Sequence, residues 1–360
     1  MTKLKIAPIY IQDSPSVVNF LYSKYDDLGR TLDFWEKRTQ LWWQNNPFYK
    51  NNLPIGWGIW AEDLLVGYLG CIYTSLKNKE ESYTSLNLTC WHVEPEFRAS
   101  SLDLFFMANS FMPEGIYFNT SPTPKVEKIL QASKYKKYIN NNNNLYCKII
   151  PLHLNDFIVS SKLYLPIKFF RPILKLFDII LNVYIKSYWD HKNIYVTDLN
   201  GISNEELINF IEKRQNNELT IERSIKFYQW LLANDDKYYI LVARDKISSQ
   251  ILAIGLYNNY ENKKNKILEL IDFYSLGDNK YTDKDIIKKM IVQISTQKDT
   301  FIKYVAISLT DYSGINLEIC PGKRKIRSKN NKYYKTSNIK MQQLLESHNY
   351  LFTAQGDMYL

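Results

Sequence analysis

The feature that most constrains the fold of this 360-residue chain is an order of predicted elements that occurs twice. An aromatic helix is followed by two strands, a third strand and another helix. These elements cover 31–49, 56–76, 83–93 and 102–106 in the first half, and 220–239, 239–259, 266–276 and 281–295 in the second. Strands and helices that alternate in this way build layered α/β domains. The repeat therefore predicts an α/β protein of two tandem domains, each with a mixed sheet flanked by helices.

The two predicted domains are 1–150 and 195–360. The first domain begins with a strand and a helix before the repeated elements, and it ends with a strand, a helix and a final strand at 145–152. The second domain closes with a helix at 340–348 and a strand at 350–360.

The segment between these domains, 151–194, is apolar and basic, and Pro166 and Pro172 interrupt it. The segment contains the cations Lys162, Lys168, Arg171, Lys175 and Lys186. They are too frequent for a bilayer span, which needs about 20 nearly charge-free residues. The pattern favours an amphipathic linker helix packed between domains. A helix in peripheral contact with a membrane surface, or a wall for an apolar substrate chain, is the alternative.

The net charge of +9 favours anionic partners. Much of it lies in 321–340, which has eight Lys or Arg and no acid. This segment is either a solvated loop or a docking surface for an anionic donor, an acidic carrier protein or a leader peptide. Nucleic acid is not an expected partner, because no recognition helix or zinc-finger spacing accompanies the cations.

The four cysteines and four histidines are scattered without metal-ligand spacing, so no metal site is expected. No signal peptide is visible, and a reducing cytoplasm with free thiols is the expected location. Aromatic residues make up 15% of the chain, which fits either a tyrosine-rich core or an aromatic-lined cavity.

The segment "VEPEFRASSLDL" at 93–104 reads as a strand end, a proline-containing turn and a helix start. Free backbone N–H groups at a helix start can bind an anion, and Arg98 stands just before this one. Nucleophile-elbow, Walker and dinucleotide-binding motifs are absent from the sequence. This turn is therefore the main candidate for chemistry.

This segment resembles the acyl-CoA-binding segment of the GNAT acyltransferase superfamily, in particular a branch with two fused GNAT-like units. The run "WWQNNPFY…GWGIW…VGYLG…WHVEPEFR" is the diagnostic part, and bacterial N-acyltransferases of polysaccharide and modified-peptide biosynthesis belong to that branch. The resemblance implies donor contacts from Trp91, Val93, Phe97, Arg98, Ala99, Ser100, Ser101 and Leu102. In the second domain, Gly277 and Lys280 are the candidates for a phosphate site.

The chain departs from the family pattern at several positions. The two loop glycines are replaced by Ser101 and Asp103, whose side chains would crowd a pyrophosphate, and Asp103 would repel it. The family's acidic tyrosine aligns with Leu130, and its Gly-Phe pair with Lys134 and Tyr135. The acid that protonates the leaving thiolate is therefore expected to be Tyr135, Tyr138 or water.

Acyl transfer also needs a group that deprotonates the amine, and two sets of residues are candidates. Cys90, His92 and Glu94 alternate along a predicted strand and so share one face, with His92 suited to act as a base by its ordinary pKa. A structural role is the alternative for a single strand histidine. In the second domain, Glu269 and Asp272 lie in an apolar strand, where a carboxylate would be paired or functional.

Two functional hypotheses follow. The first is an N-acyltransferase that moves an acyl group, with a lean toward long chains, from a CoA or carrier-protein thioester to an amine of a peptide side chain or amino sugar. The second is a catalytically silent pair of GNAT folds that binds a peptide or glycan. Loss of the loop glycines favours the second hypothesis for the first domain, whereas the second domain could still hold the donor.

Overall fold

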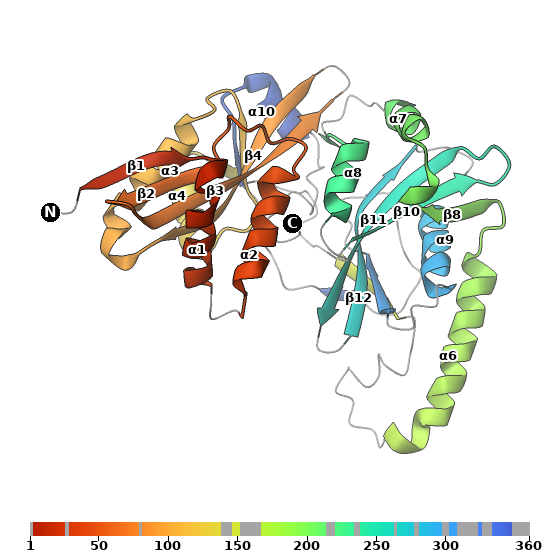
Figure 1. Cartoon of the computed structure of the whole chain (residues 1–360). Coiled ribbons are helices and arrows are strands. Elements are labelled where there is room, and N and C mark those ends of the chain that lie inside the picture. The colour runs from red at the N-terminus through yellow and green to blue at the C-terminus, as the bar shows by residue number, and fades with distance from the viewer. Residues whose placement is uncertain are drawn as a thin grey trace. The chain divides into compact units, whose positions relative to one another are not determined.

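The computed structural model describes most of the chain, which divides into two compact units (Figure 1). The described residues are 3–25, 29–78, 81–137, 146–151, 167–213, 220–233, 238–262, 265–276, 281–296, 302–307, 323–325 and 333–347. The first unit comprises 1–141, 215–234 and 329–360, and the second comprises 142–214 and 235–328.

The first unit is built on a mixed sheet with the strand order β1-β2-β3-β4-β5-β15-β6. The strands are β1 (Leu4–Ile9), β2 (Gly56–Ala61), β3 (Leu64–Lys77), β4 (Ser82–Val93), β5 (Ile116–Asn119), β15 (Tyr333–Lys335) and β6 (Lys136–Lys137). A short strand, β9 (Thr220–Ile221), pairs with the far end of β3. β4 and β5 run parallel, whereas β3 and β4 are antiparallel.

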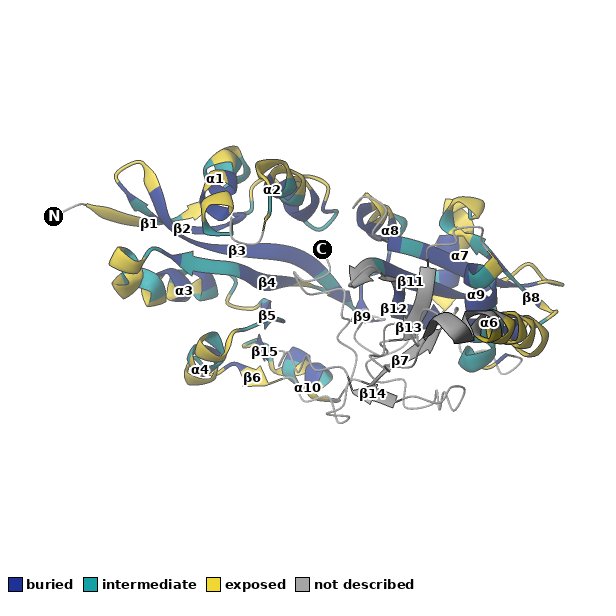
Figure 2. Cartoon of the chain, turned by 90° about the horizontal axis from the view of Figure 1, so that it is seen from below, coloured by how far each residue is buried: buried dark blue, intermediate teal, exposed yellow. Residues whose placement is uncertain are grey.

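Helices cover both faces of this sheet, so that its central strands are buried (Figure 2). The helical elements are η1 (Ile11–Asp13), α1 (Ser14–Lys24), α2 (Leu32–Thr39), η3 (Gln40–Gln44), η4 (Pro95–Ser100), α3 (Ser101–Ser110), α4 (Pro124–Ala132), α8 (Ile225–Leu232) and α10 (Ile339–Ser347). Leu104 and Phe105 of α3 and Leu130 of α4 pack on one face of the sheet. α1 and α2 lie on the other face. Burial of these apolar stripes is the main source of stability.

Side chains from the α2–η3 region complete the edge of β3. β2 pairs with β3 only as far as Gly70, so the next carbonyls of β3 need other partners. Trp43 Nε1 donates to the Cys71 carbonyl at 2.8 Å, and Asn46 Nδ2 donates to the Tyr73 carbonyl at 2.9 Å. The run "WWQNN" thus anchors the aromatic helix to the sheet.

The second unit contains a sheet with the order β14-β7-β13-β12-β11-β10-β8. Its strands are β14 (Lys323–Lys325), β7 (Tyr146–Pro151), β13 (Ile302–Ile307), β12 (Asn265–Ser275), β11 (Ile251–Asn262), β10 (Tyr238–Asp245) and β8 (Ile194–Asp198). Its helical elements are α6 (Ile167–Trp189), η5 (Leu199–Gly201), α7 (Asn204–Lys213) and α9 (Asp283–Thr296). α9 and the end of α6 share a core with β11 and β12, and Phe210 of α7 packs on Tyr274.

The α/β fold class with mixed sheets is confirmed, but the units are not the contiguous ranges 1–150 and 195–360. β7 was expected to close the first sheet, yet it lies between β13 and β14 of the second. β15 occupies the place in the first sheet between β5 and β6. β9, α8 and α10 also belong to the first unit. Strand pairing depends on a free edge and not on proximity in the chain, so this exchange leaves no local signal in the sequence.

The segments expected to be a linker and a loop also have defined structure in their described parts. Within 151–194, α6 is a helix of the second unit. Within 321–340, β14 pairs with β7 and β15 pairs with β5, so this basic segment contributes a strand to each sheet. A solvated loop is therefore the wrong description of these two stretches.

Candidate active site

The first sheet contains a β-bulge near the end of β4. Tyr68 of β3 pairs with His92, whereas Gly70 pairs with Thr89, so Cys90 and Trp91 together oppose one residue of β3. Cys90 has a φ of 51°, in the left-handed region that an L-residue rarely adopts. Bulges re-aim side chains and are frequent beside active sites.

The same strand has an open edge beyond its short pairing with β5. β4 pairs with β5 at 85–87, and β5 ends at Asn119, whereas β4 continues to Val93. Over 88–93, no described strand pairs with the β5-facing edge of β4. An amide-containing ligand can bind to such an edge as an added strand does.

His92 lies directly after the bulge, on the α1 face of the sheet. Its ring is 6.0 Å from that of Phe20 and 6.4 Å from that of Tyr25, each in an edge-on orientation. Partial burial lowers the pKa of His92 below its usual 6.5, and the nearby Lys24 ammonium lowers this pKa further. The imidazole is therefore neutral at pH 7 and able to accept a proton.

Glu94 shares this face with His92 and forms an ion pair with Lys24 of α1. Its carboxylate opposes part of the lowering of the His92 pKa. Cys90 does not continue a simple alternation with these two residues, because the bulge interrupts the alternation of the strand. The structure thus brings His92 and Glu94 together, while Cys90 occupies the bulge itself.

The opposite face of the bulge carries an aromatic stack. The Trp91 ring lies 5.0 Å from that of Phe105, nearly parallel at 10°, and Tyr135 lies 6.1 Å beyond Phe105. The Tyr135 hydroxyl donates to Asn109 Oδ1 at 2.6 Å, and burial raises the pKa of Tyr135 well above its usual 10. The indole N–H of Trp91 is buried and has no partner among the described residues, so it is a donor that a ligand could use.

The turn after β4 is a 3-10 helix that leads into α3, and some of its backbone donors are already engaged. The Phe97 N–H donates to the Glu94 carbonyl at 3.0 Å, and the Ser101 N–H donates to the Arg98 carbonyl. Of the other predicted donor contacts, Val93 is buried, Ser100 is partly buried, and Ala99 and Leu102 are exposed.

The charged residues of this turn lie at the surface. Arg98 and Asp103 are both exposed. The Arg98 guanidinium is close enough to His92 to contribute to the lowering of the His92 pKa. The Arg98 guanidinium and the neutral His92 imidazole are therefore close enough to interact electrostatically. The anion Asp103 also lies in the first turn of α3.

The end of α4 has a left-handed residue at the position where the family pattern has glycine. Lys134 has a φ of 63°, its N–H donates to the Gln131 carbonyl, and the Tyr135 N–H donates to the Leu130 carbonyl. This hydrogen-bond pair is a Schellman motif, whose left-handed position is usually glycine. Leu130, which stands where the family has its acidic tyrosine, is fully buried, and Tyr138 lies outside the described residues.

The second sheet contains a matching bulge that the sequence did not predict. Leu256 of β11 pairs with Asp272, and Tyr257 pairs with Leu270, so Ile271 is the extra residue of β12. As in the first unit, the bulged strand runs parallel to its next neighbour, here β13.

Two buried carboxylates flank this second bulge. Glu269 is 6% exposed and Asp272 is 3% exposed. Leu270 and Phe273 belong to the core under α9, and the alternation of the strand places Glu269 and Asp272 on the face opposite α9. Asn258, directly across from Glu269, has a buried Oδ1 without a partner among the described residues. The proposed phosphate residues Gly277 and Lys280 lie outside the described residues.

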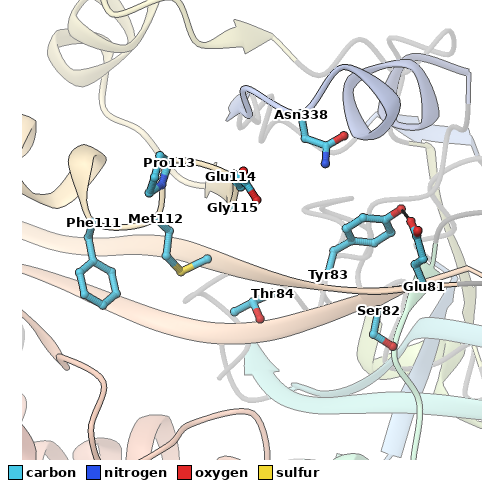
Figure 3. Close-up of a pocket in the computed structure, with 10 residues that line it drawn as sticks. All are labelled: Glu81, Ser82, Tyr83, Thr84, Phe111, Met112, Pro113, Glu114, Gly115 and Asn338. Carbon is cyan, nitrogen blue, oxygen red and sulfur yellow. Dashed lines mark hydrogen bonds between the residues drawn. The ribbon is translucent and has the colours of Figure 1, made fainter.

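A cavity of about 660 Å³ lies at the other end of β4, where β4 and β5 begin (Figure 3). It is lined by Glu81, Ser82, Tyr83, Thr84, Phe111, Met112, Pro113, Glu114, Gly115 and Asn338. Glu81 accepts hydrogen bonds from Tyr83 and from Lys340. Ser82 is separated from the bulge by most of the strand, so this cavity is distinct from the His92 region. Among the described residues, no cluster of acidic, histidine or cysteine side chains could hold a metal ion.

No protein-family model matches the chain, and no curated protein matches it in sequence. Solved structures do match over nearly its whole length. A GCN5-related N-acetyltransferase from Anabaena variabilis ATCC 29413 has a TM-score of 0.59 at 11% identity, over 94% of this chain and 74% of that one. A probable N-acyltransferase from Enterococcus faecalis V583 has a TM-score of 0.56 at 7% identity, over 93% and 73%.

The N-myristoyltransferase of Saccharomyces cerevisiae with bound myristoyl-CoA has a TM-score of 0.52 at 11% identity, over 93% of this chain and 79% of that one. Identities this low bear on the fold alone. The chain has the fold of the GNAT N-acyltransferase superfamily, as the strand, turn and helix at 93–104 predict.

Proposed function

We propose that this protein is an N-acyltransferase that moves an acyl group from a coenzyme A thioester to an amine. The observation that carries the proposal is the end of β4, where a bulge, an open strand edge and a neutral histidine lie together. The fold supports it, because proteins of similar structure are N-acetyl- and N-myristoyltransferases, one of them with bound myristoyl-CoA.

The residues of this site have separate tasks in the proposed reaction. The open edge of β4 over 88–93 binds the amides of the donor arm, and the Trp91 indole N–H is a further donor on the α3 face. His92 accepts a proton from the attacking amine, on the α1 face. A C–N bond forms, the C–S bond breaks, and the thiolate takes a proton from water, because the Tyr135 hydroxyl is engaged with Asn109.

The turn after β4 is the proposed phosphate contact. The Arg98 guanidinium is exposed and supplies a counter-charge for the pyrophosphate. The Phe97 and Ser101 N–H groups are engaged within the turn, so the cation contributes more than the backbone does.

The acceptor is proposed to be an amine of a peptide side chain or an amino sugar, and the donor a long-chain acyl-CoA. The partly buried, aromatic surroundings of His92 favour an acceptor that reaches the site as an extended chain over the α1 face. A carrier-protein thioester is the alternative donor, with 321–340 as its docking segment.

A catalytically silent binding module is the second candidate. The engaged N–H groups of the turn and the exposed Asp103 favour it, because they weaken a phosphate site. It differs in a single respect that can be measured: a silent module does not consume a thioester.

The test is an acyl-transfer assay with the purified chain. Acetyl-, octanoyl- and palmitoyl-CoA are each combined with a lysine-containing peptide, an ornithine-containing peptide and glucosamine, and amide products are quantified by mass spectrometry. We expect an amide product with the parent protein and its loss in His92→Gln. Binding of a peptide or sugar by calorimetry, without CoA binding and without product, would instead establish the silent module.

A further inference from the structure

The 23-residue helix α6 has a broad face of exposed apolar side chains. The end of the helix is anchored, because Ile185 and Trp189 are buried in the core with α9. On its outer side, large apolar residues are between 50% and 74% exposed: Leu176, Phe177, Ile179, Ile180, Val183 and Tyr188. Figure 2 shows much of α6 coloured as exposed. Contiguous apolar patches of this kind mark binding surfaces.

Charge distinguishes between the surfaces that could cover this face. The sequence of α6 contains the cations Lys168, Arg171, Lys175 and Lys186, and a single acid, Asp178. With 100° of rotation per residue, positions 168, 175 and 186 lie within about 20° of one another around the helix. They fall between the side that carries the buried Ile185 and Trp189 and the exposed apolar face. A second copy of the chain would bring like charges together, whereas an anionic lipid surface would complement them.

The dimensions of α6 also fit a helix that lies flat on a membrane. Its residues span about 35 Å at 1.5 Å each. In the described part of the chain, no helix has the length and apolar character needed to cross a bilayer. The Tyr184 and Tyr188 rings are 4.8 Å apart and exposed, and tyrosine favours the boundary between lipid and water.

We propose that α6 docks the protein onto an anionic membrane surface. The apolar face enters the boundary between headgroups and acyl chains, and the positive charges of positions 168, 175 and 186 attract the lipid phosphates. The second unit stays on the aqueous side, because α6 is joined to it through Ile185 and Trp189. This inference does not depend on acyl transfer.

Vesicle co-sedimentation of the full chain tests the proposal. The probes are vesicles of phosphatidylglycerol with phosphatidylcholine and vesicles of phosphatidylcholine alone. We expect the parent protein to bind the anionic vesicles and to lose affinity as salt is added. Changing Lys168, Lys175 and Lys186 to Gln should weaken binding on the order of a hundredfold, at roughly fivefold per cation. The variant Phe177→Ser/Ile180→Ser/Val183→Ser should weaken it by about tenfold or more per side chain.

Two control variants in the same unit should bind as the parent does. Ile247→Ser removes an apolar side chain that is 81% exposed, and Lys246→Gln removes an exposed cation of the same turn. Circular dichroism verifies that each variant is folded, which is expected because the altered apolar residues lie outside the core. Failure of the parent to bind anionic vesicles would overturn the proposal, as would equal losses in the controls. A dimer in analytical ultracentrifugation that the apolar variant abolishes, without lipid binding, would assign the face to a second copy instead.

Discussion

The strands β4 and β12 each contain a β-bulge, but the titratable side chains beside the two bulges differ. Beside the bulge of β4 stands a partly buried histidine with a lowered pKa, next to an ion pair that water reaches. Beside the bulge of β12 stand Glu269 and Asp272, both almost fully buried. A site that exchanges protons with a substrate needs access, whereas buried carboxylates are stable when their surroundings hold them in place. This difference in burial is the reason why proton transfer is proposed for β4, with β12 in a supporting role.

The largest expected effect is a loss of activity that should differ between variants of β4 and variants of β12. His92→Gln should lower kcat/KM for acyl transfer by roughly 10²–10⁴-fold, the usual contribution of a general base. Glu269→Gln keeps nearly the same shape and should lower kcat/KM by less than about tenfold. Steady-state kinetics with each folded variant measures both values. If the larger loss belongs to Glu269→Gln, the active site is at β12.

The second effect concerns the donor. Arg98→Ala should weaken CoA binding by about 1.5–3 kcal/mol, because a hydrogen bond to a charged group is lost. Isothermal titration calorimetry measures this difference, and Lys50→Ala, an exposed cation of the same unit, is the control. Equal affinity in Arg98→Ala and the parent would mean that the turn after β4 does not hold the phosphates.

The pH dependence should report His92 and its neighbours. Because the base must be neutral, kcat/KM should rise with pH through an apparent pKa below 6.5 and stay level above it. Lys24→Met removes a cation that lowers this pKa, so the acid limb should move to higher pH. Glu94→Gln removes an anion that raises it, and the limb should move to lower pH. Shifts in the same direction for both variants would show that another group controls the limb.

The smallest expected effect is a change in stability at Lys134, where the chain departs from the glycine of the family pattern. It tests whether this departure affects stability or function. Lys134→Gly places glycine at a φ of 63° and should stabilise the protein by about 0.5–1 kcal/mol. Denaturant unfolding measures the gain, and kcat should be unchanged. A drop in kcat would mean that Lys134 itself contributes to the active site.

Local elements were predictable wherever the sequence carries a local physical signal. Thr31 and Thr123 accept hydrogen bonds from the third following N–H at the starts of α2 and α4, as capping residues do. The turn between β2 and β3 falls at Glu62, which adopts a φ of 56°. The helix start near Thr282 is also confirmed, because Thr282 Oγ1 accepts from the Asp285 N–H.

Features that depend on distant segments were not predictable in the same way. β7 and β15 pair with strands that are mostly far from them in the sequence, so no local pattern marks their exchange between the sheets. The bulges at Cys90 and Ile271 need one extra residue in a long pairing, and neither sequence has a glycine or proline to mark it. His92 and Glu94 were predicted to share a face and do so. Their partners are Phe20 and Lys24 of α1 and Tyr25, the residue that follows this helix.

Hydrogen–deuterium exchange with and without coenzyme A tests directly whether the donor binds at the bulge of β4, because it needs no knowledge of the acceptor. We expect slower exchange on addition of CoA at 88–93, where the edge of β4 is open, and at 95–101 in the turn that follows. Peptides from β12 should exchange at unchanged rates. Protection confined to β12, or no protection anywhere, would contradict the placement of acyl transfer at the bulge of β4.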